Sequence, residues 1–377
     1  MNVFRISSHL FSRFRSVLAG LALLVSLLAI PVLSASAQGV LLDSVALSAQ
    51  KEYLSMDEAL KEPAKVLRLN LKNNKLTAVP PEIGQMKNLQ WLNLWSNQIT
   101  VLPSEITSLT NLQVLDISGN AQMNHASALV VASSLKNLQY LNLWNNELAT
   151  LPAEIGKVSN IKILDVSTNK LTALPTEIGN LKELRKLVLN TNKLTALPAD
   201  IGKLSALQIL IAWNNQIATL PADIGNLGKL ERLDCSNNQL TALPPQIGKL
   251  TSLNILTLTS NKLTALPADI GNLSNLQMLY LGGNQLTALP SEITKLSKLT
   301  MLALTNNPTI NVAALLPIVA EIKTLKVLNL GGNKLTALPA EIEKLAFLKT
   351  LVLSSNNFSI EEQEKIKKLL PNCEVRF

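Results

Sequence analysis

Residues 184–206 read LRKLVLNTNKLTALPADIGKLSA, and this pattern of 23 residues recurs through most of the 377-residue chain. Its most constant position is an asparagine, here Asn192. Of the twelve steps between the thirteen copies of this asparagine, ten are 23 residues long and two are 26. A fixed period of this length indicates a stack of repeats, in which each unit buries its apolar face against its neighbours. The thirteen positions are Asn74, Asn97, Asn120, Asn146, Asn169, Asn192, Asn215, Asn238, Asn261, Asn284, Asn307, Asn333 and Asn356.

The Leu-x-Leu centre of each unit has a period of two residues, which predicts a short strand with one buried face. Every copy has leucine five residues before the asparagine. Three residues before it stands Leu, Ile or Val, except at Ala212 and Cys235. The asparagine ends the strand, where its amide can bond backbone groups that the turn leaves unpaired. We therefore interpret the thirteen asparagines as structural.

The return segment of most units carries Leu-Pro followed by Ile-Gly. Proline favours the first position of a short helix, and the acid two residues later suits a helix N-terminus. We expect glycines such as Gly84, Gly156, Gly202 and Gly248 to end that helix. The two 26-residue steps lack the motif and carry apolar runs at 126–132 and 312–320, which predict longer outer helices.

The full unit, L-x-x-L-x-L-x-x-N-x-L-x-x-L-P-x-x-I-G-x-L-x-x, resembles the leucine-rich repeat over roughly residues 66–358. It is most similar to secreted bacterial proteins of the L-P-x-x-I-G-x-L type. The resemblance implies an α/β leucine-rich-repeat solenoid: a right-handed horseshoe with a concave parallel β-sheet and short helices or 3-10 turns on its convex side. It also implies a binding module and not an enzyme.

The two ends of the chain differ from the repeats. Residues 1–37 combine arginines at the start, an apolar run at 17–30 and the sequence Ala35-Ser36-Ala37, which is the pattern of a signal peptide cleaved before Gln38. The alternative is an uncleaved anchor, although the run is shorter than the roughly 20 residues of a membrane-spanning helix. Capping boxes begin at Ser55 and Ser359. The expected organisation is a signal peptide at 1–37, an N-terminal cap at 38–65, thirteen repeats at 66–358 and a C-terminal helical cap at 359–377.

Composition excludes several kinds of function. The chain has 34 basic and 26 acidic residues, and the first 37 residues contain three of the basic ones, so the remainder carries 31 against 26, a net charge of +5. That mild excess implies no nucleic-acid partner. We expect no metal, no cofactor and no catalytic group, since His125 is the one histidine after the signal segment and a lone loop histidine is usually surface decoration. Cys235 and Cys373 should lie too far apart for a disulfide.

The informative residues are those whose side chains face outward from the strands, on the inner curve. All four tryptophans fall at such positions although the chain is only 3% aromatic. Trp95 and Trp144 each stand two residues before an asparagine and flank Ser118, at a separation of two strand spacings, about 9–10 Å. We expect a slot there that accepts one inserted ring. The candidate ligand-binding residues are Trp91, Trp95, Asp116, Ser118, Tyr140, Trp144, Asp165, Trp213, Asp234 and Tyr280.

Exposed tryptophan and tyrosine beside polar groups are typical of a binding hot spot. The alternative is that the aromatic side chains have no role in binding and only pack across neighbouring strands. We expect an exported binding protein, secreted, periplasmic or at the cell surface, with no stable membrane span after signal cleavage, that recognises a protein partner through its concave face. The alternative is carbohydrate binding by the same aromatic patch, because tryptophan faces also stack on sugar rings and aspartates bond hydroxyls.

Overall fold

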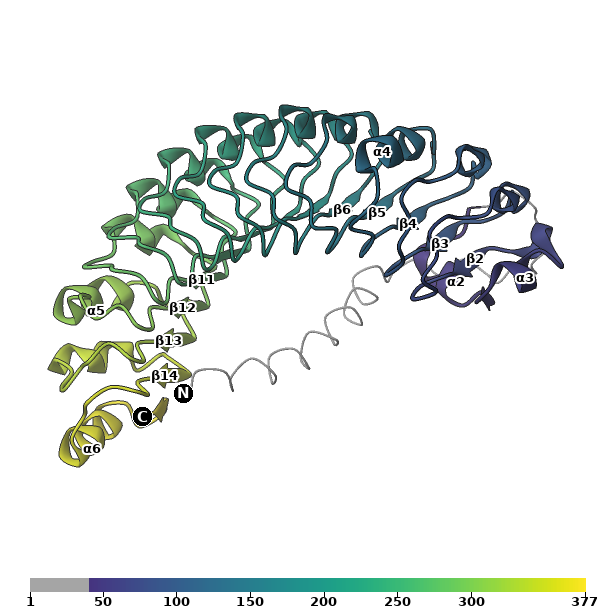
Figure 1. Ribbon diagram of the computed structural model, residues 1–377. Helices are drawn as coiled ribbons and strands as arrows, with labels where there is room; N and C mark the ends of the chain where they lie inside the picture. Colours follow the sequence, from purple (N-terminus) through teal and green to yellow (C-terminus); the bar gives the residue numbers. More distant parts are fainter. Residues whose placement is uncertain (1–40) are drawn as a thin grey trace, which may run out of the picture.

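The computed structural model describes residues 41–377, which form one curved array with strands on the inner side and helices on the outer side (Figure 1). The predicted signal peptide and the first residues of the predicted N-terminal cap lie outside this range. Fifteen parallel strands follow one another in chain order in a single sheet. They are β1 (Glu52–Tyr53), β2 (Arg68–Asn70), β3 (Trp91–Asn93), β4 (Val114–Asp116), β5 (Tyr140–Asn142), β6 (Ile163–Asp165), β7 (Lys186–Val188), β8 (Ile209–Ile211), β9 (Arg232–Asp234), β10 (Ile255–Thr257), β11 (Met278–Tyr280), β12 (Met301–Ala303), β13 (Val327–Asn329), β14 (Thr350–Val352) and β15 (Glu374–Arg376).

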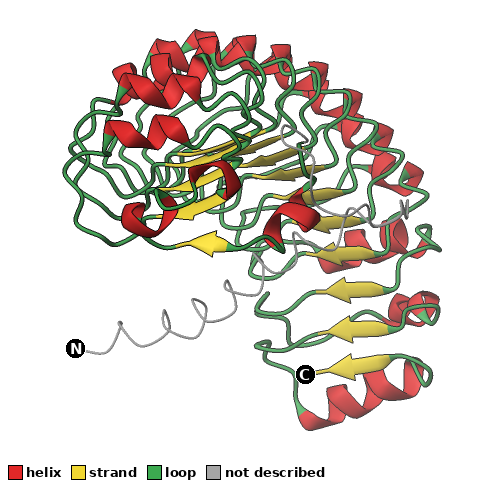
Figure 2. Ribbon diagram, turned by 90° about the vertical axis from the view of Figure 1, so that its right-hand side faces the viewer, coloured by secondary structure: helices red, strands yellow, loops and turns green. Residues whose placement is uncertain are grey.

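The convex side consists of short helical segments, one between each pair of repeat strands (Figure 2). Most are single 3-10 turns: η2 (Pro63–Lys65), η3 (Pro81–Gln85), η4 (Ser104–Ser108), η5 (Ala153–Lys157), η6 (Thr176–Asn180), η7 (Ala199–Lys203), η8 (Ala222–Asn226), η9 (Pro245–Lys249), η10 (Ala268–Asn272), η11 (Ser291–Lys295) and η12 (Ala340–Leu345). The α-helices are α2 (Ser44–Ser48), which lies on the inner side of the curve (Figure 1), and α3 (Met56–Ala59), α4 (His125–Ser133), α5 (Val312–Ala320) and α6 (Ile360–Leu369). Helices α4 and α5 occupy the two 26-residue steps, as predicted, and the strands beside them keep their pairing.

The core is a set of aliphatic columns that run the length of the array. The leucine five residues before each asparagine is fully buried, for example Leu69, Leu210 and Leu351. Cys235 occupies one of these core columns and is also fully buried, and burial raises the pKa of its thiol. Both cysteines are free, which confirms the prediction that they do not pair.

The asparagines tie each repeat to the preceding one. The Nδ2 of Asn97 donates to the carbonyl of Leu94 in its own repeat (2.9 Å) and to that of Leu71 in the repeat before (2.8 Å). Its Oδ1 accepts from the backbone N–H groups of Asn74 (3.1 Å) and Leu76 (3.0 Å). These bonds reach across repeats as well as closing the local turn. Asn74 itself is exposed, because only the N-terminal cap precedes its repeat.

The residue immediately before each asparagine has a left-handed backbone, a feature that our sequence interpretation missed. At all thirteen positions φ lies between 51° and 69°. Glycine or asparagine adopts this conformation at little cost and fills most of the positions, whereas Thr168 and Thr191 are β-branched and strained there. The turn that follows each strand is therefore specified by two consecutive residues.

The glycines of the Ile-Gly motif have a different role from the predicted one. They lie inside the 3-10 turns and have no left-handed backbone. A Cβ on Gly156 would lie 2.8 Å from the carbonyl oxygen of Glu177 in the next turn. Adjacent 3-10 turns thus approach too closely for a side chain. Where the next outer element is an α-helix, the position is Thr107, Thr294 or Glu343 instead.

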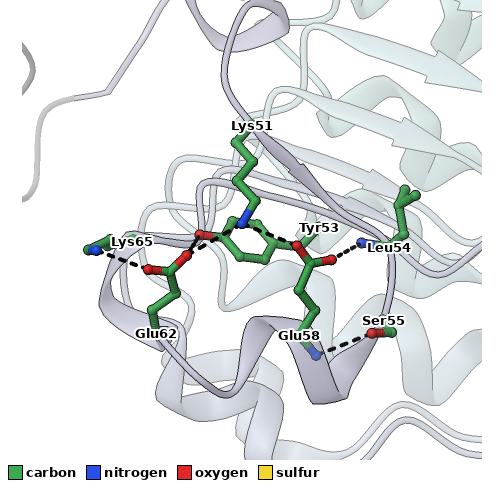
Figure 3. A network of polar contacts seen from close by, with 7 residues as sticks. All are labelled: Lys51, Tyr53, Leu54, Ser55, Glu58, Glu62 and Lys65. Atoms are coloured by element: carbon green, nitrogen blue, oxygen red, sulfur yellow. Dashed lines mark hydrogen bonds and ion pairs between the residues drawn. The ribbon is translucent and has the colours of Figure 1, made fainter.

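A polar network holds the N-terminal cap together (Figure 3), and β1 of the cap pairs with β2 of the first repeat. The hydroxyl of the buried Tyr53 donates to Glu62 at 2.6 Å, and Lys65 lies 2.9 Å from the same carboxylate. These two bonds lower the pKa of Glu62 to about 2. Lys51 bridges to Glu58 at 3.1 Å, and its ammonium lies 4.0 Å from the centre of the Tyr53 ring.

Both predicted N-cap serines are observed, each at the start of a cap helix, although the glutamate of each predicted capping box bonds another backbone N–H, that of Leu54 or Leu338. Ser55 accepts from Glu58 N at 3.2 Å at the start of α3, and Ser359 accepts from Glu362 N at 3.2 Å at the start of α6. At the C-terminal end, α6 and β15 cover the last repeat, where Phe358 and Phe377 meet edge to face. Terminal repeats need such covers because their core faces would otherwise be exposed.

Replacing Leu210 by Ala should lower the free energy of unfolding by about 2–5 kcal/mol, because a fully buried leucine leaves a cavity in a core already thinned by Ala212. Urea unfolding measures this. The half-buried neighbour Ile209, changed to Ala, is the control and should cost less. A loss below about 1 kcal/mol at Leu210 would contradict the core assignment.

Replacing Gly156 by Ala should destabilise the array by about 1–3 kcal/mol, since the new methyl group meets the backbone of the adjacent turn. Gly228→Ala is the matched control, because a Cβ there would have nothing within 4 Å. That variant should be neutral or slightly more stable. Equal effects of the two substitutions in thermal unfolding would show that close approach does not explain the motif glycines.

Candidate functional site

The concave face consists of three columns of outward side chains, at six, four and two residues before each asparagine. Neighbouring strands align these columns, as in the pairs Trp91↔Val114 and Asn93↔Asp116. Helix α2 lies on this side at the N-terminal end, where Arg68 Nη1 donates to the Ser48 carbonyl at 2.7 Å, whereas the helical segments between β3 and β14 lie on the convex side (Figure 1). The candidate residues of the sequence analysis all lie in these columns, although they do not form one cluster.

Trp95 and Trp144 come together in a pair that closes the predicted slot. Their ring centres are 6.3 Å apart and the ring planes make an angle of 57°. The prediction of a gap for an inserted ring is therefore wrong: the backbones are two strands apart, but the long side chains lean over the small, buried Ser118 between them. The pair instead presents a continuous aromatic ridge.

The aspartates near this ridge bond their own strand ends. Oδ1 of Asp116 accepts from the N–H (3.0 Å) and the hydroxyl of Ser118, and its Oδ2 accepts from Asn142 at 3.0 Å. Asp165 bonds Ser167 in the same way. Burial raises the pKa of both carboxyl groups. These acids brace the ends of the strands, and Oδ1 of each is engaged by the serine two residues later.

The other candidates are distributed along the array. Trp91 lies one strand from Arg68, whose guanidinium stands 4.9 Å from the Trp91 ring centre and 2.9 Å from Glu52. Tyr140 lies on β5, between β4 and β6, and burial raises the pKa of its hydroxyl. Trp213 follows β8, Asp234 on β9 lies 3.6 Å from Arg232, and the Tyr280 hydroxyl on β11 donates to Met278 Sδ at 3.5 Å.

An apolar column was missed by our sequence interpretation. The position six residues before asparagine is aromatic or aliphatic on most strands from β3 to β13, and each of these side chains is half-buried. Lys186 and Arg232 are its only interruptions on those strands. The signal was available, because Trp91 and Tyr140 belong to the same column. Its members are Trp91, Val114, Tyr140, Ile163, Ile209, Ile255, Met278, Met301 and Val327.

His125 corrects another expectation. It is the first residue of α4 and is 6% exposed, not a surface loop residue. Its Nε2 has no hydrogen-bond partner within residues 41–377. Burial lowers its pKa below the ordinary value of 6.5. The third repeat thus encloses a neutral imidazole, and nothing around it suggests catalysis.

Across residues 41–377, no group of three His, Cys, Asp or Glu side chains is placed to hold a metal ion. Within that same range, no helix has the length and apolar character needed to cross a membrane.

Comparison with known families identifies the repeats. A profile described as "Leucine-rich repeat region" matches residues 112–210 and 176–262. Shorter leucine-rich-repeat profiles match residues 64–121, 251–308 and 324–345. A search of curated proteins finds no match.

Several solved structures share the fold. A leucine-rich-repeat protein of Leptospira interrogans is 35% identical, with a TM-score of 0.63 over 87% of this chain and 100% of that protein. The plant peptide hormone receptor RGFR1, solved in complex with RGF2, is 29% identical, with a TM-score of 0.62 over 82% of this chain and 50% of the receptor. TLR13, solved with a single-stranded RNA, is 26% identical, with a TM-score of 0.71 over 84% of this chain and 47% of that protein.

Protonation of His125 should destabilise the protein in mild acid. Its folded pKa lies below the unfolded value of 6.5, so stability is complete above pH 6.5 and falls as the pH drops toward the folded pKa, by at most about 1.4 kcal/mol per pH unit. Urea unfolding at pH 7, 6 and 5 should show a steeper loss for the natural chain than for His125→Gln. Parallel losses would contradict a buried neutral histidine.

Proposed function

The chain belongs to the leucine-rich-repeat family, and on that premise we propose that it is an exported, non-enzymatic binding protein that recognises a protein partner through its concave face. The observation that carries this proposal is the aromatic ridge of Trp95 and Trp144 beside a long apolar column, on the side of the sheet opposite to the helical segments between β3 and β14. Large apolar and aromatic side chains arranged in this way are the usual anchors of protein interfaces.

The size of the face supports a protein ligand. Thirteen strands at about 4.8 Å give a strip roughly 60 Å long, and with a width of about 15 Å it offers on the order of 900 Å². Each partner in a standard protein interface buries about 800 Å². The complex of the plant receptor with RGF2 gives an example of this fold with a peptide ligand.

The principal contact is proposed in the N-terminal half, around the tryptophan pair, with the apolar column extending it toward β12. In the alternative of a glycan ligand, the carboxylates of Asp116 and Asp165 are the expected acceptors for sugar hydroxyls. Each already accepts a hydrogen bond from the serine two residues later, which weakens that alternative. RNA, the ligand of TLR13 in its solved complex, is disfavoured because the concave aspartates would repel phosphates.

Export is proposed on the basis of residues 1–37, whose charged start, apolar run and small-residue end are those of a signal peptide. The mature protein is then proposed to act outside the cytoplasm, in the medium, in the periplasm or at the cell surface. N-terminal sequencing of the exported product would test cleavage before Gln38.

A pull-down from the exporting cells and from cells they contact, run beside a glycan array and an RNA pool, will identify the ligand class. Once a ligand is identified, Trp95→Ala or Trp144→Ala should weaken its binding by about 2 kcal/mol or more. The loss of the ring pair should cost about 1 kcal/mol of stability. Calorimetric titration and urea unfolding measure the two effects separately.

Thr257→Ala and Thr305→Ala, on later strands of the same face, are the controls and should change binding little. Equal losses at the threonines, or none at the tryptophans, would refute the placement of the contact. A ligand found only on the glycan array would leave the proposed location of the site unchanged, but it would refute the proposal that the partner is a protein.

A further inference from the structure

A basic hollow lies at the other end of the array, outside the concave face. It has a volume of about 480 Å³ and is lined by four lysines, Lys298, Lys323, Lys326 and Lys349, around the half-buried Phe347. These residues lie just before β12, β13 and β14, at the edge where the strands begin, in the lower left of Figure 1. No carboxylate lines the hollow.

One column of this edge, seven residues before each asparagine, is uncharged in the first repeats. Seven residues before their asparagines, Gln113 donates to Gln90 and Gln139 donates to Gln113, both at 2.9 Å. Lys162 joins this ladder by donating to Gln139 at 2.9 Å. Lys326 and Lys349 occupy this column just before β13 and β14, and their backbones lie one strand spacing, about 4.8 Å, apart. Lys162 and Arg185 are also adjacent cations of the column. At β13 and β14, Lys298 and Lys323 line the same hollow and add two further positive charges.

The four charges are not compensated within residues 41–377. None of these lysines has a salt bridge there. Lys298 donates to Asn275 at 2.6 Å, and the Lys323 ammonium bonds the Ala320 carbonyl and stands 5.3 Å from the Phe347 ring centre. Both interactions leave the positive charge in place.

The one carboxylate of the neighbouring strand β15, Glu374, is already engaged. Glu374 on β15 is in register with Thr350, the residue after Lys349. It bonds Arg376 through both oxygens at 2.9 Å, and Arg376 holds the pKa of this carboxyl below its usual value. Four exposed ammonium groups with no acid among them repel one another, and an anion in the hollow relieves that repulsion.

We propose that this hollow binds an acidic polysaccharide, with sulfate or carboxylate groups on the four lysines. The side chains present favour this class. Lysine is a point charge that tolerates varied anion geometry, and the hollow has no arginine to grip phosphate in the bidentate manner. The Phe347 face is taken by Lys323, so no free aromatic ring is available to stack on a nucleic-acid base.

An acidic peptide is also disfavoured, because the hollow offers Phe347 and one leucine as its only large apolar side chains. This site is independent of the concave face. A test that refutes or supports ligand binding in the hollow therefore leaves the proposal of a protein partner on the concave face unaffected.

Heparin serves as the probe, with poly-glutamate, a single-stranded oligonucleotide and neutral dextran as comparison ligands at equal ionic strength. The double variant Lys326→Gln with Lys349→Gln should bind heparin about ten-fold or more weakly, with a smaller salt dependence. The matched control removes two exposed lysines elsewhere, Lys229→Gln with Lys249→Gln. It should lose less than about three-fold. Circular dichroism establishes that both variants are folded.

The proposal predicts heparin as the tightest of the four ligands. Unchanged heparin binding by the hollow variant would overturn it, and so would equal losses in the two double variants, which would indicate net charge alone. If poly-glutamate or the oligonucleotide bound more tightly than heparin, the proposal of a polysaccharide would be overturned, and the ligand class would be an acidic protein or a nucleic acid.

Discussion

The structure depends on buried asparagine amides that join neighbouring repeats. A primary amide enclosed in an aliphatic core is costly unless its donors and acceptor are all used. Here they are used: Asn215 donates to Leu189 in the preceding repeat and to Ala212 in its own, and accepts from Leu194. Each repeat is therefore needed to satisfy the amide of the next. This requirement fixes the stacking and holds the concave side chains in aligned columns.

Much of the fold could be predicted because its determinants are periodic. The asparagine ladder, the buried leucines, the longer helices at the two 26-residue steps and the N-cap serines each follow from spacing and local chemistry. The motif glycines were misread because their constraint comes from the next repeat: the close approach of Glu177 to Gly156 cannot be seen within one unit. His125 was misplaced for a similar reason, since its burial depends on a helix whose start the sequence leaves uncertain.

The candidate site was less predictable than the fold. Strand spacing places the backbones of Trp95 and Trp144 correctly, but it says nothing of side-chain direction, and the rings close the gap that spacing alone suggests. The aspartates were taken as free acceptors, whereas serine two residues later captures each of them. The surface that results is more apolar than expected, which favours a protein partner over a sugar. The basic hollow at β12–β14 lies on another surface and adds a second kind of recognition.

The central claim is that the protein partner is bound by the concave face and not by the outer helices. A photo-crosslinking amino acid placed at Ile209, inside the apolar column, and separately at Val130, exposed on α4, compares the two faces directly. The account predicts a discrete protein adduct from position 209 that disappears when Trp144→Ala is added, and no such adduct from position 130. An adduct from position 130 alone, or one from position 209 that is indifferent to Trp144, would contradict it.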